Sequence, residues 1–267
     1  YFRSKAPSGG NWGDAASWES SADNSIWIPA TLVPDENANT ISILNGHTVT
    51  ISTAITADQV VIENGGLLTN TAGVFTVNNG TGDDIIVQNG GIFNVASSGG
   101  PVYTTDATAA INTGGTLRIS RTGYTGNGTG MNSANYIYQT GSIAEYALTS
   151  SFSSSNVTFF PNVDATTIPI FRTTGNLAGV GAGSPTTFNG IFEANSNVTF
   201  TGAATKTFRN GIRGTGDVSG SGSGKFIING ITAELGGAGA LTVPTATGLE
   251  IGAPTVVTVT SNKTITG

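Results

Sequence analysis

Short runs of alternating apolar and polar residues cover most of this chain, and turns that contain Asn-Gly separate them. Apolar residues stand two apart before a turn, as at Val60 and Ile62, and the alternation resumes after it, as at Phe93 and Val95. A period of two puts such side chains on one face of a β-strand. Glycine supplies the positive φ that these turns require. The pattern therefore predicts strand–turn–strand units.

The same unit recurs down the first half of the chain. Its copies read ISILNGHTVTI at 41–51, VVIENGGLLTN at 60–70, IIVQNGGIFNV at 85–95, AAINTGGTLRI at 109–119 and, more loosely, YIYQTGSIAEY at 136–146. The first turn glycines, at 46, 65, 90, 114 and 141, are 19, 25, 24 and 27 residues apart. Isolated hairpins also use Asn-Gly turns, but they need no copies at this spacing. The spacing predicts an all-β fold, a single-stranded parallel β-helix or β-solenoid.

The second half carries a related phrase with glycines at 190, 211 and 230. Segments 121–135 and 172–186 interrupt the pattern, are rich in Gly, Ser, Thr and Asn, and are expected to be loops. We expect solenoid windings over residues 41–267. Residues 255–260 and 263–267 read as strands, and an open sheet edge pairs readily. The partner expected at the C-terminal end is therefore either further windings or another protein chain.

Residues 1–40 differ in kind, because they contain all three tryptophans, at positions 12, 18 and 27. A solenoid must shield its first winding, and large aromatic side chains can fill that end. We interpret residues 1–40 as an N-terminal cap, since terminal repeats are commonly atypical. The alternative is an aromatic platform on which a sugar stacks.

Composition narrows the choice of partners. Only 10% of the residues are charged, against about 25% in a typical domain, and cysteine is absent. Disulfides and thiolate chemistry are therefore excluded. Residues 1–117 hold ten acids and two bases, which argues against a nucleic-acid partner. No apolar run is long enough for a membrane span.

Three stretches carry a resemblance to a known group of proteins. They are NWGDAASW at 11–18, PDEN at 34–37 and the first repeat at 41–51. Together they resemble the N-terminal part of large secreted surface proteins of Bacteroidota, which are adhesin-like cargo of the type IX secretion system. The resemblance covers about residues 10–100 and implies a β-helical build and an extracellular or cell-surface location. It brings no catalytic residues, and the C-terminal sorting domain usual in that group is not visible here.

A search for catalytic chemistry assigns no catalytic residue. The single histidine, His47, occupies the second turn-glycine position, where the other copies have Gly66, Gly91 and Gly115. Histidine enters left-handed conformations more often than bulky residues do, so a turn role explains it better than a catalytic one. No nucleophile elbow accompanies it.

Two groups of polar residues are candidate binding sites. Asp58, Asp83, Asp84 and Asp106 fall close to one winding apart and could supply oxygen ligands to Ca²⁺; otherwise they are solvated turn carboxylates. Tyr124, Tyr136 and Tyr138, with Arg209 and Lys225, could line a carbohydrate-binding face.

The turn asparagines are given a structural role. Asn45, Asn64 and Asn89 align in the first half, and Asn189, Asn210 and Asn229 align in the second. Side-chain amides in register can form a ladder of hydrogen bonds along the winding axis.

These observations favour a non-catalytic structural or adhesive module of the cell surface, part of a larger secreted protein or fibre. Carbohydrate binding on the β-helix is the second hypothesis. A polysaccharide lyase or glycosidase on the same fold is the third, and an ice-binding surface of Thr-x-Thr pairs is a remote fourth.

Overall fold

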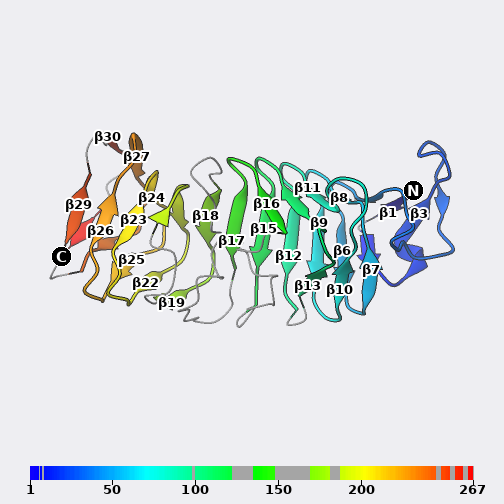
Figure 1. The fold of residues 1–267 in the computed structure, drawn as a ribbon, viewed down its shortest axis with the longest axis horizontal. Coiled ribbons are helices and arrows are strands. Elements are labelled where there is room, and N and C mark those ends of the chain that lie inside the picture. Colours follow the sequence, from blue (N-terminus) through cyan, green and yellow to red (C-terminus); the bar gives the residue numbers. More distant parts are fainter. Residues whose placement is uncertain are drawn as a thin grey trace. The chain divides into compact units, whose positions relative to one another are not determined.

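The structure is a computed structural model. It describes residues 1–5, 7, 9–97, 100–121, 135–147, 169–180, 187–244, 248–252, 256–260 and 264–266. The described residues form strands almost throughout, with one short 3₁₀ helix at Ala15–Ser17 (Figure 1). None of the described helical residues makes a segment long and apolar enough to cross a membrane. The predicted parallel β-solenoid is confirmed, and the chain divides into two compact units, Tyr1–Ile143 and Ala144–Gly267.

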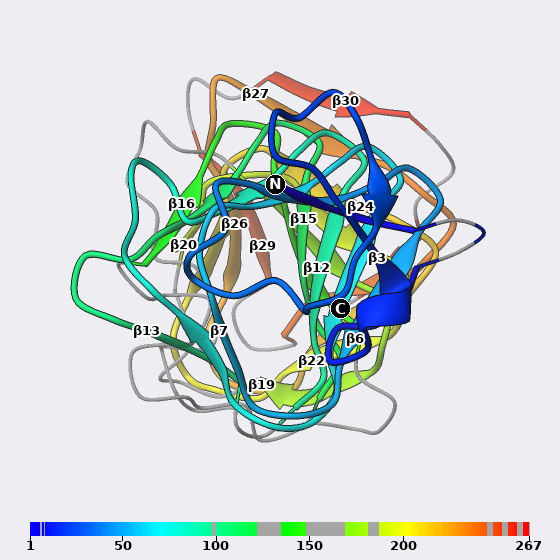
Figure 2. The ribbon, with the colours of Figure 1, turned by 90° about the vertical axis from the view of Figure 1, so that its right-hand side faces the viewer.

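Unit 1 winds around three sheets, and the chain visits them in rotation (Figure 2). The first sheet has the order β4 (Ile28–Pro29), β3 (Trp18–Ser20), β1 (Phe2–Ser4), β5 (Ile41–Ile43), β8 (Val60–Ile62), β11 (Ile85–Val87), β14 (Ala109–Ile111), β16 (Tyr136–Tyr138). The second has β2 (Gly9–Asn11), β6 (Thr48–Ile51), β9 (Leu67–Asn70), β12 (Ile92–Val95), β15 (Thr116–Ile119). The third has β7 (Ile55–Ala57), β10 (Phe75–Val77), β13 (Pro101–Tyr103). The boundary between the two units falls within β17 (Ile143–Tyr146).

Parallel pairing keeps successive windings of unit 1 in register. Ile43 pairs with Ile62, and the same column continues through Val87 and Ile111. All four side chains are fully buried, as the period of two predicts. Burial of each such side chain is worth about 1.5–3 kcal/mol, so the columns supply the main stabilising term.

The turn glycines are the second regular feature. Gly46, Gly65, Gly90, Gly114 and Gly141 all have positive φ, as their place in the repeat predicts. The backbone amide of each of the first four donates to the carbonyl of the next one along the axis. At Gly66 and Gly91, the second glycine of the turn, a Cβ would approach within 2.6 Å of a carbonyl oxygen of the preceding winding. Close stacking of the turns therefore excludes side chains there.

Residues 1–40 build directly onto the first winding. β1 and β2 pair in parallel with β5 and β6, whereas β3 and β4 follow in antiparallel order. Trp12 and Trp18 are fully buried, with ring centroids 5.0 Å apart, and Trp12 reaches Phe75 at 6.0 Å. They form an aromatic cluster at this end of the core. Trp27 lies outside it, beneath the guanidinium of Arg3 at 4.4 Å.

Unit 2 repeats the three-sheet plan. Its first sheet is β20 (Thr187–Phe188), β23 (Lys206–Phe208), β26 (Phe226–Ile228), β29 (Leu249–Ile251). Its second is β18 (Ile170–Thr173), β21 (Phe192–Ala194), β24 (Gly211–Arg213), β27 (Thr232–Leu235), β30 (Val256–Val259). Its third is β19 (Leu177–Val180), β22 (Val198–Phe200), β25 (Val218–Gly220), β28 (Leu241–Thr242), β31 (Ile265–Thr266). Phenylalanine rings fill the interior, and Phe188 and Phe208 stack at 5.2 Å.

The expected loop at 172–186 is partly wrong. Residues 172–173 belong to β18, and residues 177–180 form β19. Phe171 and Thr173 are buried, so period-two alternation continues through a Gly- and Thr-rich stretch that lacks the turn phrase. Residues 181–186 and most of 121–135 lie outside the described residues.

Candidate functional site

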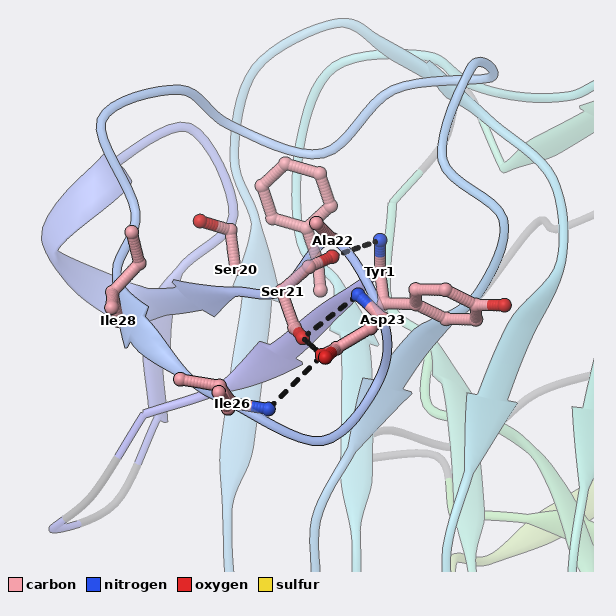
Figure 3. A pocket seen from close by; sticks show the side chains of 8 residues that line it. Tyr1, Ser20, Ser21, Ala22, Asp23, Ile26 and Ile28 are labelled. Atoms are coloured by element: carbon pink, nitrogen blue, oxygen red, sulfur yellow. Dashed lines mark hydrogen bonds between the residues drawn. The ribbon is translucent and has the colours of Figure 1, made fainter.

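A pocket of about 520 Å³ lies in the N-terminal segment, between β1, β3 and β4 (Figure 3). Its lining is Tyr1, Phe2, Ser20, Ser21, Ala22, Asp23, Ile26 and Ile28. Register explains its apolar floor. Phe2 pairs with Ile41 of the first winding on one side and with Ser20 on the other, and Ser20 pairs with Ile28. In-register neighbours share a face, so the inward face of the first sheet continues beyond the core into this cap pocket.

Asp23 gives the cap pocket a fixed negative charge. One carboxylate oxygen accepts hydrogen bonds from the backbone amides of Ser25 at 2.9 Å and Ile26 at 3.1 Å, and from the Ser21 hydroxyl at 3.0 Å. The amides of Ile26 and Ser25 hold the pKa of Asp23 well below its usual range. The carboxylate is therefore ionised at any physiological pH, beside an Ile26 side chain that is 72% exposed.

Charges on the second sheet of unit 2 form a ladder along the winding axis. Glu193 accepts from Arg172 at 2.6 Å on one side and from Arg213 at 2.7 Å on the other. Arg213 reaches Glu234 at 3.6 Å in the following winding, and Glu234 accepts from the Thr260 hydroxyl at 2.8 Å. Burial raises the pKa of Glu193, but the two guanidinium groups outweigh it and the net pKa is lowered.

A shallow hollow of about 350 Å³ lies beside this ladder. Asn210, Thr232, Glu234, Thr258 and Thr260 give it polar groups, and Ile191 and Ala233 give it apolar ones. The side chain of Asn210 is fixed because its amide donates to the Asn189 carbonyl at 2.8 Å. The hollow therefore presents hydroxyl, amide and carboxylate groups of the kind that bind sugar hydroxyls.

Three apolar columns of unit 2 become more exposed at the last described strands, β29, β30 and β31. Ile251, Val259 and Ile265 continue the inward columns of Ile228, Leu235 and Leu241, which are almost fully buried. Yet these three last members are 49%, 63% and 46% exposed.

Comparison with known proteins gives no relative. No family model, no curated protein and no solved structure matches the chain. The function is therefore argued from the geometry of the described residues.

The two described tyrosines that were expected to bind carbohydrate do not lie on the surface. Tyr136 and Tyr138 are only 6% and 5% exposed, and Tyr136 packs edge-on against Tyr103 at 5.3 Å. They are inward core residues, which corrects the expectation of an exposed platform. Tyr124 lies outside the described residues.

The two bases from that prediction also lie apart. β23 and β26 pair from Lys206 with Phe226 to Phe208 with Ile228. Lys225 comes just before the start of β26, whereas Arg209 comes just after the end of β23, so the two bases lie at opposite ends of this strand pair. Lys225 forms an ion pair with Glu250. No stripe of adjacent bases results.

The aspartates proposed as metal ligands have separate roles. Asp84 is fully buried and accepts from the backbone amides of Gly80 at 2.5 Å and Thr108 at 2.8 Å. Asp83 accepts from the Thr108 hydroxyl at 3.0 Å, and Asp106 is exposed in a left-handed turn. Burial and the charge of Asp84 raise the pKa of Asp58. Within the described residues, no three His, Cys, Asp or Glu side chains could jointly hold a metal ion. Calcium binding stays a prediction.

The turn asparagines of unit 1 each lie against the glycine turn of the next winding, but the turns are joined by backbone hydrogen bonds. Oδ1 of Asn45 would lie 2.5 Å from a Cβ added to Gly65, and Asn64 and Asn89 lie equally close to Gly90 and Gly114. The hydrogen bonds that join these turns from winding to winding run between the glycine backbones. In unit 2, Asn210 bonds to the carbonyl of Asn189, and Asn229 contacts the Gly252 position.

His47 has a different role from the one expected. Its φ is not positive, and its Nδ1 lies 2.8 Å from the Oγ of Ser4 in the cap. At the matching glycines, the carbonyl of the preceding winding leaves no space for a side chain. His47 belongs to the first winding, which pairs with cap strand β1 instead of with an earlier repeat, and its side chain fits there.

Sequence reasoning also missed one buried lysine and the ladder of ion pairs in unit 2. Lys206 is 1% exposed, faces inward over the Phe200 ring at 5.9 Å, and has a pKa lowered by burial. Arg172, Glu193 and Arg213 are 21 and 20 residues apart, which is one winding each. That spacing was a usable signal for the ladder.

Proposed function

We propose that this chain is a non-catalytic structural and adhesive module of a larger extracellular surface protein or fibre. One observation carries the proposal: the described charged pairs join neighbouring strands to each other. Arg3–Glu19, Lys225–Glu250 and the Arg172–Glu193–Arg213–Glu234 ladder all bridge adjacent strands. These groups stiffen the windings, and stiffness is what a surface scaffold requires.

The location rests on the sequence resemblance to secreted adhesin-like proteins of Bacteroidota. The absence of cysteine and the low charge are compatible with that proposal. Export by a type IX system is part of the same proposal.

The proposal is tested with beads that carry the purified chain. The beads should adhere to cell-surface material under flow, and soluble polysaccharides should pass through with no new reducing ends or unsaturated products. Catalytic turnover on any polysaccharide, lost in Asp58→Asn but kept in the exposed control Asp106→Asn, would contradict it and favour a lyase or glycosidase.

Carbohydrate binding is the second candidate, and the hollow beside the charge ladder favours it. Glu234→Gln and Thr258→Val should then weaken retention on a glycan column, whereas Thr207→Val on another sheet should not. Unchanged retention in all three variants would exclude the hollow as the binding site.

A further inference from the structure

Two of the aspartates predicted as metal ligands meet at Gly80, in the corner between the third and first sheets of unit 1. Asp58 follows β7, Asp84 precedes β11, and Gly80 lies in the turn between β10 and β11. Oδ1 of Asp84 accepts the amide of Gly80 at 2.5 Å, and a Cβ added to Gly80 would collide with Oδ2 of Asp58. The two carboxylates therefore flank one glycine, whose missing side chain keeps space open beside them.

One oxygen of this pair lacks a hydrogen-bond donor. Asp58 is 8% exposed, and within the described residues its buried Oδ1 accepts no hydrogen bond. A buried carboxylate oxygen ordinarily has a donor or a cation against it, because its desolvation is otherwise costly. Burial, and then the charges of Asp84, Glu36 and Asp35, raise the pKa of Asp58. Negative charge therefore converges on this corner.

Asp84 is held ready to act as a ligand. It is fully buried, and its Oδ2 accepts the amide of Thr108, in the next winding, at 2.8 Å. A carboxylate oxygen has two lone pairs, so each oxygen of Asp84 keeps one after accepting one amide. Residues 79–82 are exposed beside the pair, which gives an ion a route into the corner.

We propose that this corner binds one Ca²⁺ ion, with Asp58 and Asp84 as its carboxylate ligands. Ca²⁺ takes about six to eight oxygen ligands, and backbone carbonyls and water are common among them. Such atoms must complete the shell, because in the described part of the chain no third acidic or histidine side chain joins the pair. Ca²⁺ accepts a mixed and irregular shell, whereas Mg²⁺ requires near-ideal octahedral geometry.

Asp83 and Asp106 lie outside this site. Asp83 accepts the Thr108 hydroxyl at 3.0 Å, and Asp106 is exposed in a left-handed turn of the next winding. Asp106→Asn is therefore a matched control for Asp58→Asn, because it removes the same charge without touching the pair. Asp84 is left unaltered in the test, since two backbone amides depend on its carboxylate.

Isothermal titration calorimetry tests the proposal on the full chain after treatment with a chelator. The unaltered chain and Asp106→Asn should each bind one Ca²⁺ with a Kd of about 1 mM or tighter. Asp58→Asn should bind Ca²⁺ at least about tenfold more weakly, because the site loses one of its two negative charges. Mg²⁺ should bind to the unaltered chain at least about tenfold more weakly than Ca²⁺ does.

Thermal unfolding separates a loss of binding from a loss of the fold. In chelator, Asp58→Asn should unfold at a higher temperature than the unaltered chain, because a buried charge without a partner is gone. Saturating Ca²⁺ should raise the Tm of the unaltered chain and of Asp106→Asn by about 3–8 °C. It should raise the Tm of Asp58→Asn by less than about 1 °C.

Three results would overturn the calcium site. They are no Ca²⁺ binding by the unaltered chain, equal Ca²⁺ affinity in Asp58→Asn, and equal affinity of the unaltered chain for Mg²⁺ and Ca²⁺. Adhesion of the coated beads is measured separately, so each of these results leaves the proposed surface role unchanged.

Discussion

The Oγ of Ser4 lies 2.8 Å from Nδ1 of His47, and this contact ties the cap to the first turn of the solenoid. The same hydroxyl oxygen accepts the backbone amide of Leu44 at 2.9 Å. Ser4→Ala removes this hydroxyl and leaves Nδ1 of His47 and the amide of Leu44 without it inside a buried site. We expect a loss of about 1–3 kcal/mol in the free energy of unfolding, measured by urea denaturation. Ser42→Ala, on the outer face of β5, should change it by no more than about 0.5 kcal/mol.

Stacking of the turns predicts different costs for two similar glycines. Gly46 and Gly65 both have positive φ, but a Cβ at Gly46 meets nothing within 4 Å, whereas one at Gly65 meets Asn45 at 2.5 Å. Gly46→Ala should cost only the backbone strain, about 1–2 kcal/mol. Gly65→Ala should cost about 1–3 kcal/mol more. Thermal unfolding measures both.

A double variant isolates the contact behind that difference. Asn45→Ala removes the group that the new methyl would meet, so it should recover most of the extra loss in Gly65→Ala. Equal costs for the two glycine variants, with no recovery, would contradict the stacked turns.

Glu193 predicts a stabilisation that depends on pH. Its folded pKa lies below its ordinary value of 4.5, so its contribution is full above that value and is lost as pH falls through the folded pKa. Glu193→Gln should lower stability by about 1.5 kcal/mol at neutral pH and by progressively less below pH about 4.

Asp58 predicts the opposite sign. Its folded pKa is raised by burial and by the charges of Asp84, Glu36 and Asp35, so folding favours the protonated form. That contribution is present below the unfolded pKa and is lost as pH rises through the folded pKa. Asp58→Asn should therefore raise Tm by about 2–4 °C at neutral pH, and the gain should vanish in acid. A lower Tm at neutral pH would show that the carboxylate has a bound cation or another stabilising partner.

The strands and turns were predictable because each signal is local. Alternation and the glycine with positive φ repeat in every copy of the phrase, so the register of Ile62 on Val87 follows from the sequence. The inward position of Tyr136 and Tyr138 was available from the same alignment, since they occupy the columns of Val60 and Ile62. The residue type, a tyrosine with a polar tip, suggested a surface role instead.

The cap pocket was not predictable in this way. It depends on two antiparallel strands, β3 and β4, and on the loop around Asp23, and none of these carries the repeat phrase. Its apolar floor exists because Phe2 pairs with Ile41 and, through Ser20, the same register continues to Ile28. That relation is tertiary, and only the paired strands reveal it.

The central claim is that neighbouring windings stack one residue on one residue. The chain has no cysteine, so an introduced pair reports cleanly on distance. In the register of β8, β11 and β14, Asn64 lies against Asn89, and Thr113 lies one winding further. Adjacent strands are about 4.8 Å apart, within reach of a disulfide, and strands two windings apart are not. Mild oxidation should join Asn64→Cys to Asn89→Cys within one molecule, as read by mass spectrometry, and should leave Asn64→Cys with Thr113→Cys reduced. Joining of the second pair, or failure of the first, would contradict the stacked windings.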